Sequence, residues 1–370
     1  MAIFNTVYGG GYKTFTISWE EKSDMSSWWT YSDDATWLTA GSTEFDKFFW
    51  YSAVKLSTAG VETAEVKQSW WVLDISQLGT LTSGDNVMIR FPVLWIKMSK
   101  SWSVVTLSIT KELNKTGYQY YAHTKWSTVK NAFYIWAYEA YNDSNILKSW
   151  SWKTPVNHIS LNNARTYAWN NGTWYWVLSF FQKMFISALY IMKYGNPNCQ
   201  STVWAWYTGG SSLQTTWLTN SQTSATYWTS SSTQPIKIFW LENWWGNLNE
   251  RLDGIYTTNS KILVNVTNSN YSSTPTEWVD YVDSWVSFTN NAEWDIASIG
   301  GTNLWMFIPS SISWTDYTKY YTDSSKTSTS SIPHISWYRT DWNNAWIFHL
   351  FCTWTWTTSQ VWSWVRIMYL

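Results

Sequence analysis

The sequence predicts an α+β fold in which strands dominate, and two observations carry that prediction. Short runs of alternating apolar and polar residues recur between residues 29 and 110, a pattern typical of paired strands separated by polar turns. One long apolar stretch, residues 178–193, instead has helical spacing, with one face formed by Phe181, Phe185, Leu189 and Met192. At 370 residues the chain is long enough to bury a substantial core.

The elements follow one another without an internal repeat of solenoid length. Strands are expected at residues 14–19, 86–92, 103–110, 133–139, 261–266 and 365–370, the last closing the chain. A second, short helix is expected at residues 242–253, which makes two helices in all. Residues 207–234 are rich in Ser, Thr, Gln and Gly and predict a long loop or a weak hairpin.

Composition excludes several classes of function. The 24 basic and 25 acidic residues nearly cancel, and no run of five basic residues occurs, so neither nucleic acid nor an anionic membrane is expected as a partner. The two cysteines, Cys199 and Cys352, have no metal-ligand spacing. One disulfide bond between them stays open. We therefore predict no metal and no cofactor.

Neither a leader nor a membrane span is expected. The first residues lack a basic region followed by an apolar stretch, so no signal peptide is predicted. The most apolar stretch, residues 177–194, carries Gln182, Lys183 and Lys193 and is barely long enough to cross a bilayer. It is interpreted as a buried helix without membrane insertion.

Tryptophan is far too common for an ordinary domain. The chain has 35 Trp and only 16 Gly, and five Trp-x-Trp pairs lie in contexts that look like turns, including residues 150–152 and 354–356. Turns favour Gly, which tolerates positive φ, over a bulky aromatic residue. Our hypothesis is an alternative genetic code, in which many of these residues are Gly encoded by a reassigned UGA codon. The alternative is a Trp-rich carbohydrate binder.

Six segments, in their order along the chain, resemble one known family. They are Asn86 to Pro92, Phe133 to Glu139, Asn163 to Ala168, the end of the long helix at Leu189 to Tyr194, Leu241 to Asn247 with Asp253 and Gly254, and Val365 to Leu370. Together they resemble bacteriophage tail proteins with the formylglycine-generating-enzyme-like variant of the C-type lectin fold, similar to the variable proteins of diversity-generating retroelements. The resemblance covers about residues 30–370 and improves if Trp136, Trp337, Trp342 and Trp346 are Gly.

The resemblance implies a division of the chain and a function. Residues 1–28 would be an attachment segment that contacts other tail proteins, residues 29–130 a β-rich part, and residues 131–370 a C-type-lectin-like receptor-binding domain. The protein would be a trimeric tail-fibre adhesin on the virion, extracellular where it acts, and would bind a glycan or protein on a bacterial surface. Ligand-contacting residues of the family carry over to Tyr338, Arg339, Asp341, Asn343, Asn344, His349 and Phe351. For His349 and Phe351, simple alternation in a half-buried strand is an equal alternative.

Enzymatic interpretations are weaker. The resembled cysteine-oxidising enzymes use a cysteine pair, and Cys352 has no second cysteine near it in the matching region. Asp33 and Asp34 are adjacent, so on a strand they would point to opposite faces, and a turn or cap is expected instead. Trp244 and Trp245 are interpreted as structural. No enzyme is predicted, although a structural virion or cell-surface protein without a ligand and a polysaccharide-degrading tailspike remain alternatives.

Overall fold

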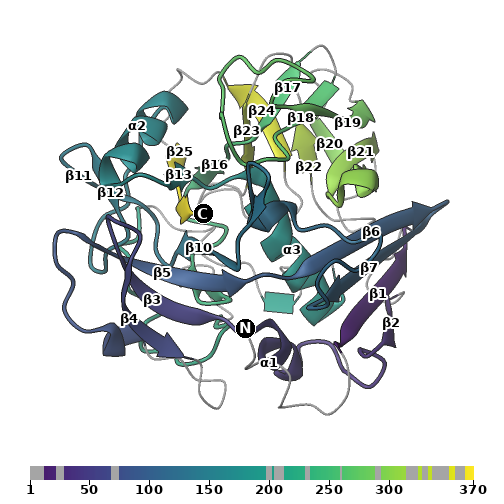
Figure 1. The fold of residues 1–370 in the computed structure, drawn as a ribbon, viewed down its shortest axis with the longest axis horizontal. Helices are drawn as coiled ribbons and strands as arrows, with labels where there is room; N and C mark the ends of the chain where they lie inside the picture. Colours follow the sequence, from purple (N-terminus) through teal and green to yellow (C-terminus); the bar gives the residue numbers. More distant parts are fainter. Residues whose placement is uncertain are drawn as a thin grey trace.

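The fold is described from a computed structural model, and the strand-dominated α+β class is confirmed. The structure describes residues 12–21, 29–67, 75–196, 202–203, 212–229, 234–258, 261–287, 293–313, 324–326, 332–335, 350–354 and 363–370. Within these ranges there are 26 strands but only three α-helices. Figure 1 shows the strands gathered into sheets around a central helix.

A four-stranded antiparallel sheet begins the described chain. Its order is β2-β1-β7-β6, and its strands are β1 (Thr14–Glu20), β2 (Trp29–Asp33), β6 (Trp95–Ser101) and β7 (Val104–Thr110). Phe15, Ile17 and Trp19 alternate along β1 and are buried, which is the period-2 pattern of a half-buried strand. The expected strands at residues 14–19 and 103–110 are therefore confirmed.

A six-stranded antiparallel sheet holds both the middle and the end of the chain. Its order is β13-β26-β10-β5-β3-β4, with β3 (Ser52–Ser57), β4 (Glu62–Lys67), β5 (Asp85–Pro92), β10 (Ala132–Trp136), β13 (Tyr175–Val177) and β26 (Ile367–Tyr369). The sheet takes strands from residues 29–130 and from residues 131–370. The closing strand, expected at residues 365–370, lies in the interior of this sheet, between β13 and β10.

The second half of the chain builds a seven-stranded sheet and a three-stranded sheet. The seven-stranded order is β21-β20-β22-β24-β23-β16-β25, with β16 (Asn249–Arg251), β20 (Glu293–Gly300), β21 (Ile308–Ser313), β22 (Ser324–Lys326), β23 (Ile332–Ile335), β24 (Leu350–Trp354) and β25 (Ser363–Val365). The three-stranded sheet is β17 (Ile255–Thr258), β18 (Lys261–Val264) and β19 (Val282–Ser287). Figure 1 shows both on the same side of the molecule, at the green and yellow end of the colour scale.

Three hairpins and three 3₁₀ turns complete the described elements. The hairpins are β8 (Thr124–Lys125) with β9 (Thr128–Val129), β11 (Tyr141–Asp143) with β12 (Ile146–Lys148), and β14 (Lys237–Ile238) with β15 (Leu241–Glu242). The 3₁₀ turns are Ile75–Leu78, Tyr121–His123 and Thr302–Leu304. Strand β2 ends at Asp33, and Asp34 lies in the turn that follows, where its carboxylate accepts a hydrogen bond from the Thr14 backbone N–H.

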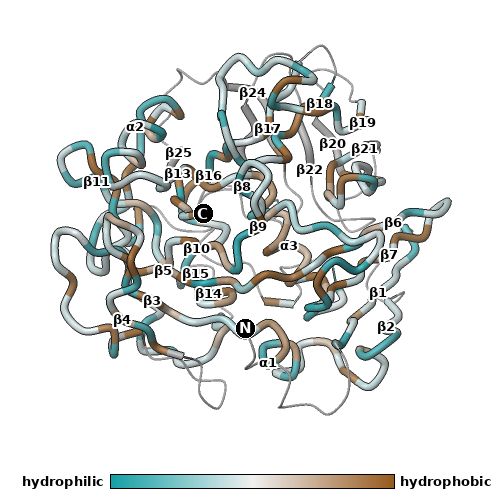
Figure 2. Tube along the Cα trace, in the orientation of Figure 1, coloured by the Kyte–Doolittle hydropathy of each residue, from teal (hydrophilic) through white to brown (hydrophobic). Residues whose placement is uncertain are grey.

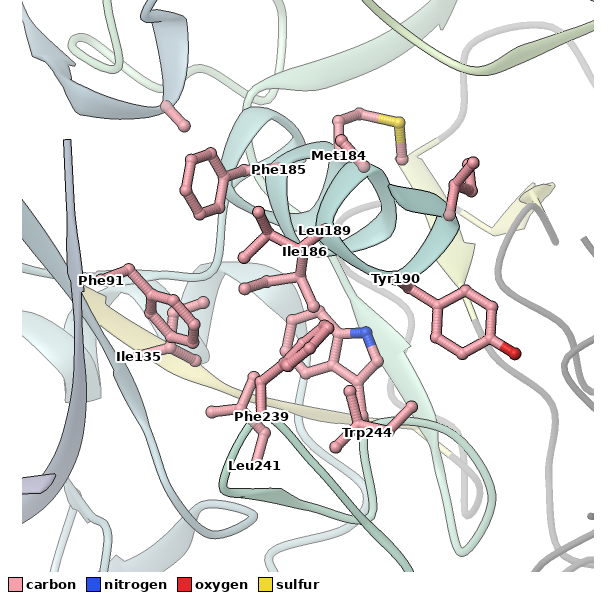
Figure 3. Close-up of a cluster of buried hydrophobic side chains, with 14 of the residues drawn as sticks. Phe91, Ile135, Met184, Phe185, Ile186, Leu189, Tyr190, Phe239, Leu241 and Trp244 are labelled. Atoms are coloured by element: carbon pink, nitrogen blue, oxygen red, sulfur yellow. The ribbon is translucent and has the colours of Figure 1, made fainter. Parts of the chain in front are cut away.

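The core centres on helix α3 (Phe180–Tyr194), every residue of which is buried. Its start and end lie within two residues of the helix expected at 178–193. Figure 2 shows its apolar character, and Figure 3 shows its side chains facing Phe91 and Ile135 on one side and Phe239 and Trp244 on another. The expectation that Trp244 and Trp245 are core residues is confirmed, since both are at most 2% exposed.

Two expectations about helices are wrong. Residues 242–253 form no helix, because Asn243 and Asn247 have positive φ values of 49° and 60°, which interrupt helical geometry, and the chain passes into β16. The described residues also hold three α-helices rather than two. The unexpected ones are α1 (Glu44–Phe49), of only six residues, and α2 (Leu161–Asn171), whose Asn-rich sequence has little helical preference.

Candidate functional site

Most of the predicted ligand-contacting residues lie outside the described residues. These are Tyr338, Arg339, Asp341, Asn343, Asn344 and His349. The seventh, Phe351, has its backbone in β24, where its register partners are Lys326 of β22 and His334 of β23. The structure therefore brings the last predicted residue into the middle of the seven-stranded sheet.

Two described strands border the segment that contains the other six residues. Strand β23 ends at Ile335, strand β24 begins at Leu350, and the two are antiparallel neighbours in the sheet. Residues 336–349 thus connect two hydrogen-bonded strands. On its other side β23 pairs with β16, where Ile335 is the register partner of Glu250.

Glu250 of β16 belongs to a buried ionic cluster. Its carboxylate is 0% exposed and lies 3.8 Å from the Lys183 ammonium of α3 and 3.5 Å from the Arg366 guanidinium. Burial raises the pKa of Glu250, and the two cations oppose that shift. A buried carboxylate needs such partners, because an isolated buried charge costs several kcal/mol. We call Glu139, Lys183, Glu242, Glu250 and Arg366 the buried ionic cluster.

Arg366 joins three segments of the chain that are distant in sequence. It lies between β25 and β26, and its guanidinium donates to the backbone carbonyls of Trp136 at 2.7 Å, Ala137 at 3.2 Å and Glu242 at 2.7 Å. Planar guanidinium groups suit several acceptors at once. Arg366 thereby ties the end of β10 and the end of β15 to the closing strands.

Glu139 is a second buried carboxylate of the cluster. It accepts hydrogen bonds from the side-chain amides of Asn243 at 3.1 Å and Asn247 at 2.6 Å. Burial raises the pKa of Glu139 to about 8, while these amides and the Arg366 charge work in the opposite direction. Asn243 and Asn247 are the two left-handed residues in the region where a helix was expected. Their backbone conformation directs both side-chain amides toward Glu139.

Glu242 is the third buried carboxylate of the cluster, and it accepts three hydrogen bonds. It accepts from the backbone N–H groups of Trp217 and Thr219, both at 2.8 Å, and from the Thr219 hydroxyl at 2.7 Å. Burial raises its pKa despite these hydrogen bonds and the nearby Lys237. Its hydrogen bonds hold the loop around residues 217–219 against β15, which is a structural role.

A bidentate ion pair joins α2 to the short connection between β16 and β17. The Arg165 guanidinium contacts both carboxylate oxygens of Asp253 at 2.7 Å, and Asp253 is 2% exposed. Parallel paired hydrogen bonds of this kind are among the strongest polar contacts in proteins. Two more of the segments that suggested the family, residues 163–168 and residues 253–254, therefore meet in space.

Sequence reasoning missed the buried ionic cluster. The available signal was Arg366, a charge within the apolar stretch from Val365 to Leu370, because arginine is almost never fully buried without partners. The residues that supply those partners could not be identified by spacing, since they lie in three separate segments, around residues 136–139, 242 and 250. Only the fold brings them together.

No part of the described structure offers an arrangement for metal binding, since no group of three or more His, Cys, Asp or Glu side chains is suitably placed there. A hollow of about 250 Å³ has a mainly apolar lining and no acidic residue. It is lined by Ile75, Leu78, Gly79, Thr80, Leu81, Val87, Trp150, Ser151 and Trp217.

No protein-family model matches the chain, and no curated protein matches it either. None of the helices in the described ranges is long and apolar enough to cross a membrane.

Proposed function

We propose that the protein is a tail-fibre adhesin of a bacteriophage with a C-type-lectin-like domain of the formylglycine-generating-enzyme type. It binds a glycan or protein on the bacterial surface through residues 336–349 together with Phe351, and it does so without catalysis. The proposal rests on the family resemblance of six segments, four of which provide residues to the buried polar contacts described above.

One observation supports this assignment most directly: the proposed binding segment follows β23, a strand that pairs with β16 of the buried ionic cluster. Ile335 is in register with Glu250, which is held between Lys183 and Arg366. Binding residues are commonly mounted on connections between elements of a rigid scaffold. The buried ionic cluster contributes to such a scaffold through Glu250, because β16 pairs with β23.

The residue types in this segment suit adhesion. Tyr338 and Arg339 provide large contact area, and Asp341, Asn343 and Asn344 provide adaptable hydrogen bonds. In a trimeric fibre, three such sites act together, and multivalency converts weak single-site binding into firm attachment. The partners are then a bacterial receptor at this end and other tail proteins at residues 1–28.

The experiment is a binding assay of the purified protein on candidate host cells. The test variant changes Tyr338, Arg339, Asn343 and Asn344 to Ala. A matched control changes Asn163 and Asn170 on the exposed side of α2 to Ala. Adhesion predicts saturable binding that the test variant loses and the control keeps.

The other outcomes separate the alternatives. Equal binding by both variants would contradict the assignment of the surface. No binding to any cell of the host that the phage infects would favour a structural virion protein. Release of reducing sugar from host polysaccharide would favour a tailspike enzyme.

A further inference from the structure

Ten tryptophans in the described structure have a left-handed backbone, with φ between 52° and 91°. They are half of the 20 non-glycine residues with positive φ in the part of the chain that is described, and six of the others are Asn, which tolerates this conformation. A bulky aromatic residue there is an outlier. The ten are Trp50, Trp102, Trp126, Trp152, Trp174, Trp217, Trp240, Trp278, Trp285 and Trp305.

Two of them occupy a hairpin position that requires glycine. Trp102 and Ser103 form the two-residue loop between β6 and β7, and Trp126 and Ser127 form the loop between β8 and β9. In each loop only the first residue has positive φ, 55° and 53° respectively. This is the pattern of a type II′ turn, which has Gly at its first central position.

A third hairpin shows the complementary pattern. Phe239 and Trp240 form the two-residue loop between β14 and β15, and both have positive φ, 46° and 69°. Two consecutive positive values define a type I′ turn, whose second central residue is most often Gly. Trp240 stands at that second position.

Other members of the set occupy a helix end and a strand irregularity. Trp50 is the left-handed residue that ends α1, and its N–H donates to the Asp46 carbonyl, a position at which Gly is strongly preferred. Trp285 lies in β19 where the register with β18 shifts, and Gly is the usual left-handed residue of a β-bulge.

Several of these rings offer little packing to compensate for the strain, although Trp240 is 1% exposed. The Trp102 side chain is 96% exposed, Trp285 is 71% exposed and Trp278 is 68% exposed. By contrast, Trp19, Trp95, Trp244 and Trp245 are at most 4% exposed, and none has positive φ. Backbone conformation separates these two groups of tryptophans, whereas burial does so only in part, because the ring of Trp240 is also buried.

We propose that the native protein carries Gly at the ten left-handed positions, because these codons are UGA and the native translation system reads UGA as Gly. Trp19, Trp95, Trp244 and Trp245 are then true tryptophans encoded by UGG. The exposed pair of Trp278 and Trp285, with ring centroids 6.4 Å apart, is consequently not a sugar-stacking surface. If the protein is also a phage adhesin, its host uses the same code, a consequence that rests on the proposed function.

The decisive measurement is tandem mass spectrometry of tryptic peptides from the protein isolated from its native source. The peptide of residues 238–251 contains Trp240 together with Trp244 and Trp245, so it has an internal control. We expect Gly at position 240 and Trp at positions 244 and 245, and Gly at positions 102 and 126 in their own peptides. Trp at positions 102, 126 and 240 would overturn the proposal, as would UGG at these positions in the gene.

A folding measurement tests the physical argument separately. In the chain as printed, W102G and W126G relieve a left-handed backbone, and the rings that they remove are 96% and 52% exposed. Each is expected to raise the folding equilibrium constant about fivefold. The matched change W244G removes a buried ring and is expected to lower it. A fall in stability for W102G and W126G, similar to that for W244G, would contradict the inference.

Discussion

Replacing Arg366 by Met should remove a large part of the free energy that stabilises the folded protein. The substitution leaves the carbonyls of Trp136 and Glu242 without their 2.7 Å donors and removes one of the two cations beside Glu250. Removing one member of a buried, hydrogen-bonded charge group costs about 3–5 kcal/mol. Total stabilities are about 5–15 kcal/mol, so the loss is about a fifth of the total or more.

The assay is urea-induced unfolding followed by intrinsic fluorescence, with Arg90→Met as the matched control. Arg90 forms ion pairs with Glu62 and Glu65, but its side chain is 26% exposed, and pairs of this kind contribute about 0–1 kcal/mol. A difference of less than about 1 kcal/mol between the two variants would refute the claim that the buried ionic cluster holds the scaffold together.

Two further predictions concern buried charges. Burial raises the pKa of Glu139 to about 8 from 4.5, so the stability it contributes as a neutral acid is complete below pH 4.5 and is lost as the pH rises to 8. Glu139→Gln should therefore flatten the pH dependence of the unfolding free energy in this window, and an unchanged profile would rule the explanation out. Asp46 and Lys193 form a buried pair at 2.8 Å, so Asp46→Asn alone should cost about 3–5 kcal/mol, whereas Asp46→Leu with Lys193→Met should cost much less. Equal losses in the two variants would show that the pair does not couple.

The sequence alone determined the elements whose pattern is local. The alternation of Phe15, Ile17 and Trp19 is enough to place β1, and the spacing of Phe181, Phe185 and Leu189 is enough to place α3. Both periods follow from backbone geometry, so a short window contains the full signal. The excess of Trp at apparent turns was equally visible without a structure.

Only the tertiary structure decided the features that depend on distant partners. Residues 242–253 have helical composition, but Asn243 and Asn247 turn toward Glu139, more than a hundred positions earlier in the chain. Likewise, nothing in the stretch around Arg366 reveals that its charge is matched by Glu250. Buried polar groups must be satisfied by whichever elements the topology brings near them, and this requirement overrides local preference. For the predicted ligand-contacting residues, the fold decided which strands carry residues 336–349, while the residues themselves remain a prediction from the sequence.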